Sequence, residues 1–573
     1  MTDSVVTEQD SPVTELVAGL SRVTAADRRA LPIGLDVAEA AADKYGACRR
    51  PVPMRTFDQS TGESRVVGSP CKSTVSSVCP SCAKRARALR KQQCKEGYHL
   101  DREPVQEKKD PTEHQVGLYT ARADLAQDYR SAKAAGDTEL MDGIREVVAD
   151  LDRELRESGV RGRLVALDPI DKPRRKRSTK RRQDTPELPR KKVQKHTIKA
   201  AYPGGYRPGM MVTLTMDSYG RINRTGDRDK DGKVCSDGSP VHPDSYDYTR
   251  AARDIAFAAA CFDRWVQNLR RAVGYDVQYF AVVEPQKRGA PHFHVLIRTD
   301  IPRELIRRVT DATYHQVWWP HFDEPVYWDG NMPVWDPAAM TFVDPRTRRP
   351  LAGWDEVMDH LDTMDELDPA HVVRFGPQVD PRDIKGVIPG EESNKTINYV
   401  TKYLTKSISE VLETDIERTR AHYDRLHEEL QYVPCSPRCP VWLRYGIVPQ
   451  GASDKTVPGR CTGKAHRRDT LGLPGRRVLV SRKWTGKTLP DHKADRADFV
   501  RQMLAQAGMS KPQIDHLRVV PVRPGDKDCP PREVLIFQGI ADRTTWQNEY
   551  YRAVGLLPNP PGTHDLSAIP EAA

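Results

Sequence analysis

The stretch GAPHFHVLIRT, Gly289 to Thr299, carries two histidines one residue apart within a run that reads as a β-strand. A Gly-Ala-Pro turn precedes it, and the apolar residues that follow favour strand entry rather than helix. Because strand side chains alternate between two faces, His292 and His294 point the same way and Phe293 points the other. Two imidazoles on one face can bind a cation or a phosphate. They can equally be two surface histidines on a half-exposed sheet.

The composition favours a nucleic-acid partner. Of 573 residues, 38% are hydrophobic and 30% are charged, so packed cores share the chain with solvated segments. The net charge of +10 favours a polyanion, nucleic acid before a membrane surface. No apolar run approaches the ~20 residues of a membrane span. The N-terminal MTDSVVTEQDSPVTEL lacks the apolar core of a secretion signal. We therefore expect a cytoplasmic protein with no membrane partner.

Two groups of cysteines predict structural Zn²⁺ sites. A disulfide framework is not expected in a cytoplasmic chain. A CxxC knuckle such as CPSC brings two thiolates onto one tetrahedral ion, and a second pair of ligands closes the site. The candidate ligands are Cys48, Cys71, Cys79 and Cys82 in the first group, and Cys435, Cys439, Cys461 and His466 in the second. The alternative is a set of free, buried thiols.

The alternation of elements and charge runs predicts an α+β chain made of several parts. We expect a weakly structured lead-in (1–40), a Cys-rich region (41–118), a helical segment (119–171), a basic linker (172–200), a sheet domain (201–430) with an irregular insertion (318–383), a second Cys-rich and basic region (431–492), and a C-terminal part (493–573) with a helix, a strand at EVLIFQG and a Pro-rich tail. Within the sheet domain, the patterns predict strands at 210–216, 277–284 and the histidine run, and helices at 247–274, 302–317 and 393–413. The second and third strands form an antiparallel hairpin.

The basic linker begins with KPRRKRSTKRRQ at Lys172. Prolines and charges of mainly one sign argue against a packed core and indicate a flexible linker or basic arm. Such a segment either contacts DNA phosphates, with salt-dependent affinity, or is only a solvated connection. The expected DNA contacts are Arg174, Arg175, Lys176, Arg177, Lys180, Arg181 and Arg182.

A second motif, YVTKYLTK, places tyrosines beside lysines on a predicted helix. Tyr399 and Tyr403 share a face, and Lys402 and Lys406 form the adjoining row. Each pair alone is consistent with packing or with a solvated face. Together with the histidine strand, they supply a tyrosine nucleophile, a bound cation and lysines that stabilise developing charge. Glu284 ends the neighbouring strand and is the expected third ligand, in a set that suits Mg²⁺ or Mn²⁺.

PHFHV and YVTKYLTK, in this order, resemble the motifs of HUH endonucleases, and among them the rolling-circle replication initiators. The wider pattern, including EPQKRGAPHFH, PGRCTGKAH and RRVLVSRKW, is similar to the RepSA-like initiators of actinobacterial plasmids and integrative elements. The resemblance implies an HUH-type catalytic domain over 201–430. It also implies nicking of one strand at a plasmid origin, with the 5′ phosphate kept on a tyrosine. The free 3′-OH would prime a host DNA polymerase, and unwinding would need a host helicase.

The resemblance also implies roles for single residues. His292 and His294 would be metal ligands, and Tyr403 the first nucleophile, with Tyr399 as its alternating partner or a packing residue. Lys402 fits the family pattern beside Tyr403. A relaxase or transposase of the same superfamily, or a non-catalytic zinc-containing DNA-binding regulator, are the alternative functions.

Overall fold

The structure is a computed structural model that separates into two units, Val105–Asp184 and the remainder, Met1–Pro104 with Thr185–Ala573. The described residues are 34–100, 102–104, 110–160, 164–167, 187–197, 209–224, 226–228, 232, 237–364, 367–384, 391–402, 404, 414–509, 516–522, 526 and 528–556.

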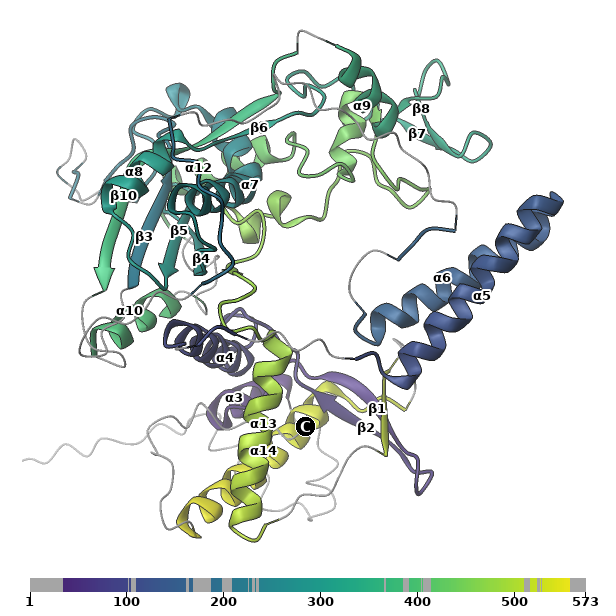
Figure 1. Ribbon diagram of the computed structural model, residues 1–573, viewed down its shortest axis with the longest axis vertical. Coiled ribbons are helices and arrows are strands. Elements are labelled where there is room, and N and C mark those ends of the chain that lie inside the picture. Colours follow the sequence, from purple (N-terminus) through teal and green to yellow (C-terminus); the bar gives the residue numbers. More distant parts are fainter. Residues whose placement is uncertain are drawn as a thin grey trace, which may run out of the picture. The chain divides into compact units, whose positions relative to one another are not determined.

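The larger unit contains a six-stranded antiparallel sheet with the order β12-β4-β5-β3-β10-β6, of which Figure 1 labels β4, β5, β3, β10 and β6. Its strands are β3 (Gly209–Met216), β4 (Tyr279–Pro285), β5 (Pro291–Ile297), β6 (Tyr314–Val317), β10 (His371–Ile384) and β12 (Val478–Val480). The histidine run is therefore β5, an interior strand between β4 and β3. The three predicted strands and the β4–β5 hairpin are confirmed.

One face of this sheet packs against α7 (Tyr248–Val273), supported by α8 (Arg303–Ala312) and α12 (Glu417–Leu430). The α7 helix begins at Asp247, whose side chain accepts a hydrogen bond from the backbone N–H of Arg250, and ends at Gly274 with φ 87°. Phe293 of β5 stacks on Phe262 of α7, with ring centroids 5.1 Å apart. The residue between the two histidines thus points into the main core, as predicted.

The opposite face of the sheet carries the two histidines and is covered by α4 (Pro80–Tyr98) and α10 (Glu391–Lys402). A second hydrophobic cluster joins the helices to the sheet; it contains Phe280, Val282, Leu296, Ile397, Val400, Cys94, Tyr98 and Trp484. The helix that follows the first cysteine knuckle and the helix that carries the tyrosine motif therefore share one core.

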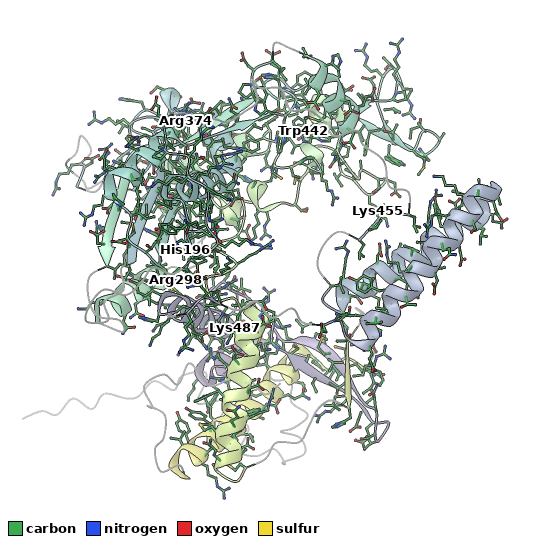
Figure 2. The ribbon with its side chains drawn as sticks, viewed as in Figure 1. His196, Arg298, Arg374, Trp442, Lys455 and Lys487 are labelled. Atoms are coloured by element: carbon green, nitrogen blue, oxygen red, sulfur yellow. The ribbon has the colours of Figure 1, made fainter. Side chains whose placement is uncertain are left out.

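Arg298, which is labelled in Figure 2, follows β5 and connects the sheet to segments before and after it in the chain. Its buried guanidinium donates to the carbonyl oxygens of Gly97 and Trp484, both at 2.7 Å. A further bond reaches the hydroxyl of Thr197 at 3.3 Å. Gly97 lies so close to the Trp484 ring that a Cβ at this position would come within 2.2 Å of it.

A smaller sheet and two peripheral pairs of strands complete the larger unit. The smaller sheet has the order β13-β1-β2, from Leu517–Pro521, Val52–Asp58 and Ser64–Ser69. The helices α3 (Leu35–Tyr45), α13 (Leu489–Gln506) and α14 (Arg532–Leu556) belong to this region, and α14 packs on α3 and β2. The remaining elements are β7 (Val334–Asp336), β8 (Thr341–Val343), β9 (Ala352–Gly353), α9 (Trp354–Thr363), β11 (Ile447–Val448) and 3₁₀ turns at Pro243–Ser245, Pro440–Tyr445, Lys464–His466 and Arg468–Thr470.

The smaller unit contains a hairpin of two helices, α5 (Glu113–Ala135) and α6 (Thr138–Glu157). A turn at Gly136, with φ 74°, separates them, and the Asp137 side chain caps α6. Tyr129, Ile144 and Val148 form its core. The helical stretches expected here are confirmed.

Three local predictions are wrong. EVLIFQG lies in α14 rather than in a strand; its short apolar run fits either element, and Leu535, Ile536 and Ile540 are buried on one helix face. The helix predicted over 302–317 ends at Ala312, and β6 follows it. The insertion predicted as irregular contains α9 and most of β10. None of the helices within the described ranges is both long enough and apolar enough to cross a membrane.

Candidate metal and tyrosine site

Strand register brings Glu284, His292 and His294 together on the α4–α10 face of the sheet. Glu284 of β4 is paired with His292 of β5, and His294 lies two residues further along the same strand. The Nε2 atom of His294 is 2.7 Å from Oε1 of Glu284. One ligand atom from each of the three residues lies within 4.8 Å of the others, so the three could hold a metal ion.

Two threonines of β3 lie beside the Nδ1 atoms of these histidines. Thr215 pairs with His292 and Thr213 with His294 across the β3–β5 ladder. Their hydroxyls lie 3.1 and 3.4 Å, respectively, from the Nδ1 atoms. When Nδ1 carries the ring proton and donates to the hydroxyl, Nε2 keeps its lone pair for a metal. Sequence reasoning missed this pair, although the threonines alternate with apolar residues in MMVTLTM as the histidines do in PHFHV.

The surroundings keep His292 neutral. Burial, then the neighbouring His294 and Arg288, lower the pKa of His292 to about 3. A histidine must be neutral to offer a lone pair to a metal. Two imidazoles and one carboxylate are therefore a donor set that fits a divalent cation. The Nδ1 atoms of both imidazoles lie beside hydroxyl groups, which leaves their Nε2 atoms for the cation.

The α10 helix brings Tyr399 to the same site. The rings of Tyr399 and His294 meet edge to face, with centroids 5.6 Å apart. Ile397 and Val400 on the buried side of α10 hold the helix on the sheet, while 44% of Tyr399 remains exposed. Lys402 is the last residue of this helix and is exposed. Two further candidates on this motif, Tyr403 and Lys406, lie outside the described residues.

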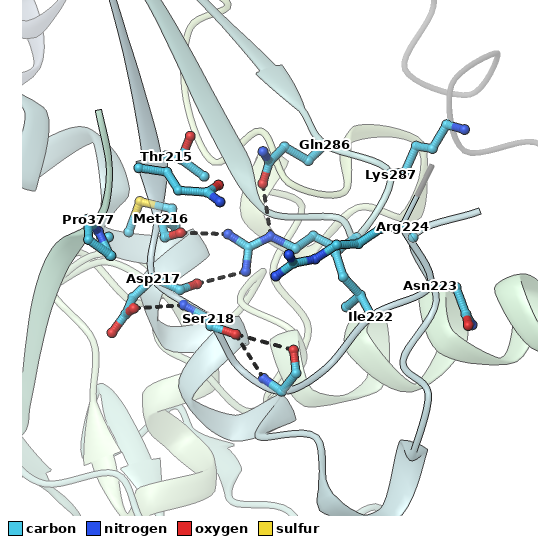
Figure 3. Close-up of a pocket in the computed structure, with 15 residues that line it drawn as sticks. Thr215, Met216, Asp217, Ser218, Ile222, Asn223, Arg224, Gln286, Lys287 and Pro377 are labelled. Carbon is cyan, nitrogen blue, oxygen red and sulfur yellow. Dashed lines mark hydrogen bonds between the residues drawn. The ribbon is translucent and has the colours of Figure 1, made fainter. Parts of the chain in front are cut away.

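A pocket of about 500 Å³, drawn in Figure 3, lies next to His292. Thr215 and Gln286 line the pocket, and both side chains also approach Nδ1 of His292, at 3.1 and 3.4 Å. Its other walls come from the end of β3 and the loop that follows it, from the β4–β5 turn and from the middle of β10. Their residues are Met216, Asp217, Ser218, Gly220, Ile222, Asn223, Arg224, Gly238, Lys287, Arg288, Gly376, Pro377 and Gln378.

The first cysteine group forms a compact cluster. The sulfurs of Cys48, Cys71, Cys79 and Cys82 all lie within 4.8 Å of one another, so the group could hold a metal ion. Hydrogen bonding to Cys79 and Cys82, together with burial, raises the pKa of the Cys48 thiol well above its ordinary value. Arg85 donates to the sulfur of Cys82 at 3.3 Å. A bound cation would relieve the repulsion between several thiolates in so small a space.

The second group also closes into a four-ligand cluster. Ligand atoms of Cys435, Cys439, Cys461 and His466 lie within 4.8 Å of one another. The Nε2 atom of His466 is 3.5 Å from the Cys439 sulfur, while its Nδ1 lies 2.8 Å from the carbonyl oxygen of Leu430. A backbone carbonyl that accepts from Nδ1–H directs Nε2 toward a metal.

The basic residues expected to contact DNA lie outside the described residues; they are Arg174, Arg175, Lys176, Arg177, Lys180, Arg181 and Arg182.

An antiparallel sheet with a His₂Glu group and a tyrosine on one face, together with two cysteine-rich clusters, defines an α+β protein with three candidate metal centres. A family model described as "Replication initiator protein, pSAM2" matches residues 34–542. The chain belongs to this RepSA family of replication initiators, as the sequence motifs predicted.

A curated relative from Streptomyces ambofaciens, named "Replication initiator protein", is 26% identical to this chain over 268 residues. The match covers 41% of this chain and 52% of the relative, so it spans about half of the relative's length. No solved structure matches this chain.

Proposed function

We propose that this replication initiator nicks one strand of origin DNA by tyrosine transesterification within an HUH-type domain. The observation that carries the proposal is the placing of Glu284, His292 and His294 within 4.8 Å of one another, with the ring of Tyr399 5.6 Å from that of His294. Membership of a replication initiator family supports origin DNA as the substrate.

Glu284 and the Nε2 atoms of His292 and His294 would hold Mg²⁺ or Mn²⁺. A cation there would polarise the scissile phosphate and neutralise charge in the transition state. Thr213 and Thr215 would fix the orientation of both imidazoles by accepting from their Nδ1–H groups.

The tyrosine motif would supply the nucleophile. The phenolic oxygen bonds to phosphorus as the bond from phosphorus to the 3′ oxygen breaks. The phenol loses its proton to solvent, and the departing 3′ oxygen takes one up. The products are a 5′-phosphotyrosine link and a free 3′-OH, which primes rolling-circle replication. Lys402, on the same turn, would stabilise the phenolate or the phosphoryl oxygens.

The two tyrosines have different support. The sequence motif favours Tyr403 as the first nucleophile, whereas the contact with His294 supports Tyr399 as a nucleophile. An alternating pair would allow a second transfer that closes the displaced strand.

Zn²⁺ is our assignment for the two cysteine clusters, because three or four thiolates with at most one imidazole are typical of structural zinc. With the basic linker, these regions would contact the duplex, whereas the sheet would take the single-stranded nick site.

The test is nicking of a labelled single-stranded oligonucleotide that spans the origin of the encoding element. With Mn²⁺, the wild-type protein should cut once and remain linked to the 5′ end of the downstream fragment on a denaturing gel, and EDTA should prevent this. The first nucleophile is the tyrosine whose change to Phe, Y399F or Y403F, abolishes the first cut while DNA binding is kept. Y551F is the control, since Tyr551 is similarly exposed at 48%.

Two outcomes would contradict the proposal. Full nicking by the double variant Y399F/Y403F would rule out this motif as the source of the nucleophile. Tight binding of the confirmed origin by the wild-type protein, without any cut or adduct, would favour a non-catalytic DNA-binding regulator.

A further inference from the structure

The pocket beside His292 has features that the nicking reaction alone does not require. We propose that it binds one nucleobase of the single-stranded DNA, from a nucleotide next to the scissile phosphate. This inference rests on the proposed function and names how the same site recognises its substrate. The position of the pocket supports this assignment. Thr215 and Gln286 contact His292 and also line the pocket, so a phosphate held at the triad would bring a neighbouring base to it.

The shape of the pocket depends on an irregularity in β10. Phe375 pairs with Met216 and Val379 with Leu214, so three residues of β10 intervene where β3 has one. These three residues, Gly376, Pro377 and Gln378, all line the pocket. Bulges of this kind are frequent beside active sites, where they redirect side chains.

Gly376 makes the bulge possible. A Cβ at this position would lie 3.0 Å from the Asp217 Cα and 3.1 Å from the Met216 carbonyl oxygen. Both are backbone atoms that cannot move aside easily. A Cβ here would require the backbone of β3 to shift by a few tenths of an ångström, so glycine favours the close approach of β10 that forms one wall of the pocket.

Arg288 fixes the opposite wall. Its guanidinium donates to the carbonyl oxygens of Met216 and Asp217 at 2.6 and 2.7 Å, and to Oε1 of Gln286 at 2.8 Å. Figure 3 marks these three bonds as dashed lines that end at Met216, Asp217 and Gln286. It also lies over the ring of Tyr219, 5.0 Å from the centroid. These bonds hold the buried guanidinium, and its positive charge, in place at the pocket wall before any ligand binds.

The mixture of lining groups fits a base better than a phosphate alone. Ile222 and Met216 are apolar, Gln378 offers an amide, and Lys287 and Arg224 add positive charge. A nucleobase presents apolar faces that stack and polar edges that hydrogen-bond, and guanidinium planes can stack on bases. The volume, about 500 Å³, lies within the usual range for ligand pockets.

The test removes the protein side chain and the DNA base of the proposed contact in separate experiments. Gln378 and Arg224 line the pocket, are exposed, and are not among the candidate ligands or nucleophiles. Binding of Q378A and R224A to the fluorescent origin strand is measured by anisotropy in EDTA. The same measurement is made on strands with one abasic nucleotide, placed in turn at each position near the nick. The controls are Q267A on α7 and R382A on β10, which remove exposed side chains outside the pocket.

We expect both pocket variants to bind the intact strand about tenfold more weakly, and the controls to bind as the wild-type protein does. One abasic position should weaken wild-type binding to a similar extent, and on that strand the variants and the wild type should bind equally. The pocket proposal would be overturned if both pocket variants bound the intact strand as the wild-type protein does. It would also be overturned if every abasic position weakened wild-type binding equally, or if the wild-type protein bound no single-stranded DNA. Because binding is measured without metal, a wild-type protein that binds but never nicks would overturn only the proposed function.

Discussion

Thr215 and Thr213 show how much of the candidate site depends on single hydroxyl groups. Each lies beside the Nδ1 atom of a histidine, at 3.1 Å for His292 and 3.4 Å for His294. A hydroxyl that accepts from Nδ1–H both orients the ring and leaves Nε2 able to bind a metal. The hydroxyls would act on a bound metal indirectly, because the candidate ligands themselves come from β4 and β5.

T215V replaces this hydroxyl with a methyl group of similar size. We expect Mn²⁺ affinity, measured by isothermal titration calorimetry, to fall about 10- to 100-fold, because the His292 ring loses its orienting partner. T213V should have a smaller effect, since its contact is longer. T249V changes an exposed threonine on α7 and serves as the control. Unchanged Mn²⁺ affinity in T215V would mean that the hydroxyl does not orient a ligand.

Among the elements, α4 connects the first cysteine group to the helix that carries Tyr399. It begins at the CxxC knuckle and ends against Trp484, and it shares a hydrophobic cluster with the tyrosine helix α10. The place of the candidate nucleophile on the sheet therefore depends on a helix about 300 residues earlier in the chain.

G97A tests the contact between α4 and Trp484. The added Cβ would lie 2.2 Å from the indole ring, so the helix must shift, and overpacking of this kind costs about 1–3 kcal/mol. G539A, in α14, is the matched control because no atom lies within 4 Å of its Cβ position; it should stabilise the protein by about 0.5–1 kcal/mol. The free energy of unfolding is measured with denaturant. Equal stability of G97A and the wild-type protein would show that α4 does not pack this tightly.

The sequence predicted those parts of the site that lie in short, continuous motifs. Strand alternation placed His292 and His294 on one face, and the hairpin brought Glu284 beside them. The partnership of Thr215 with His292 was not predictable, because it depends on the register of strands whose residues are 77 positions apart. The length of β10 was missed for a related reason: its bulge interrupts the alternation by which a strand is recognised.

At the scale of the whole molecule, we expect the distribution of charge to govern the proposed encounter with DNA. The net charge is +10, and the basic linker contributes a dense group of cations. In contrast, arginines on the α5–α6 hairpin are partly paired with acids on the same helix, as Arg145 is with Asp142 and Arg153 with Asp150. Paired cations release fewer counterions from DNA when they bind.

Two matched sets of four substitutions to Gln test this difference on duplex origin DNA. One set changes Arg174, Arg175, Lys176 and Arg177 in the linker, and the other changes Arg130, Arg145, Arg153 and Arg156 on the hairpin. Only the linker set should flatten the plot of log affinity against log salt concentration, by about 0.9 for each phosphate that the protein no longer neutralises. Binding is followed by anisotropy at several KCl concentrations. Equal slopes for both sets would indicate that the linker is only a solvated connection.

The hydrogen bonds of Arg298 have a consequence for how such chains can recombine. The residue follows the histidine strand, yet its partners Gly97, Thr197 and Trp484 come from segments on both sides of it in the sequence. A gene exchange that imported only the stretch from the first strand of the sheet to the tyrosine helix would leave this buried cation facing foreign neighbours. Inheritance should therefore favour the transfer of nearly the whole coding sequence, so that relatives diverge as intact chains rather than as mosaics.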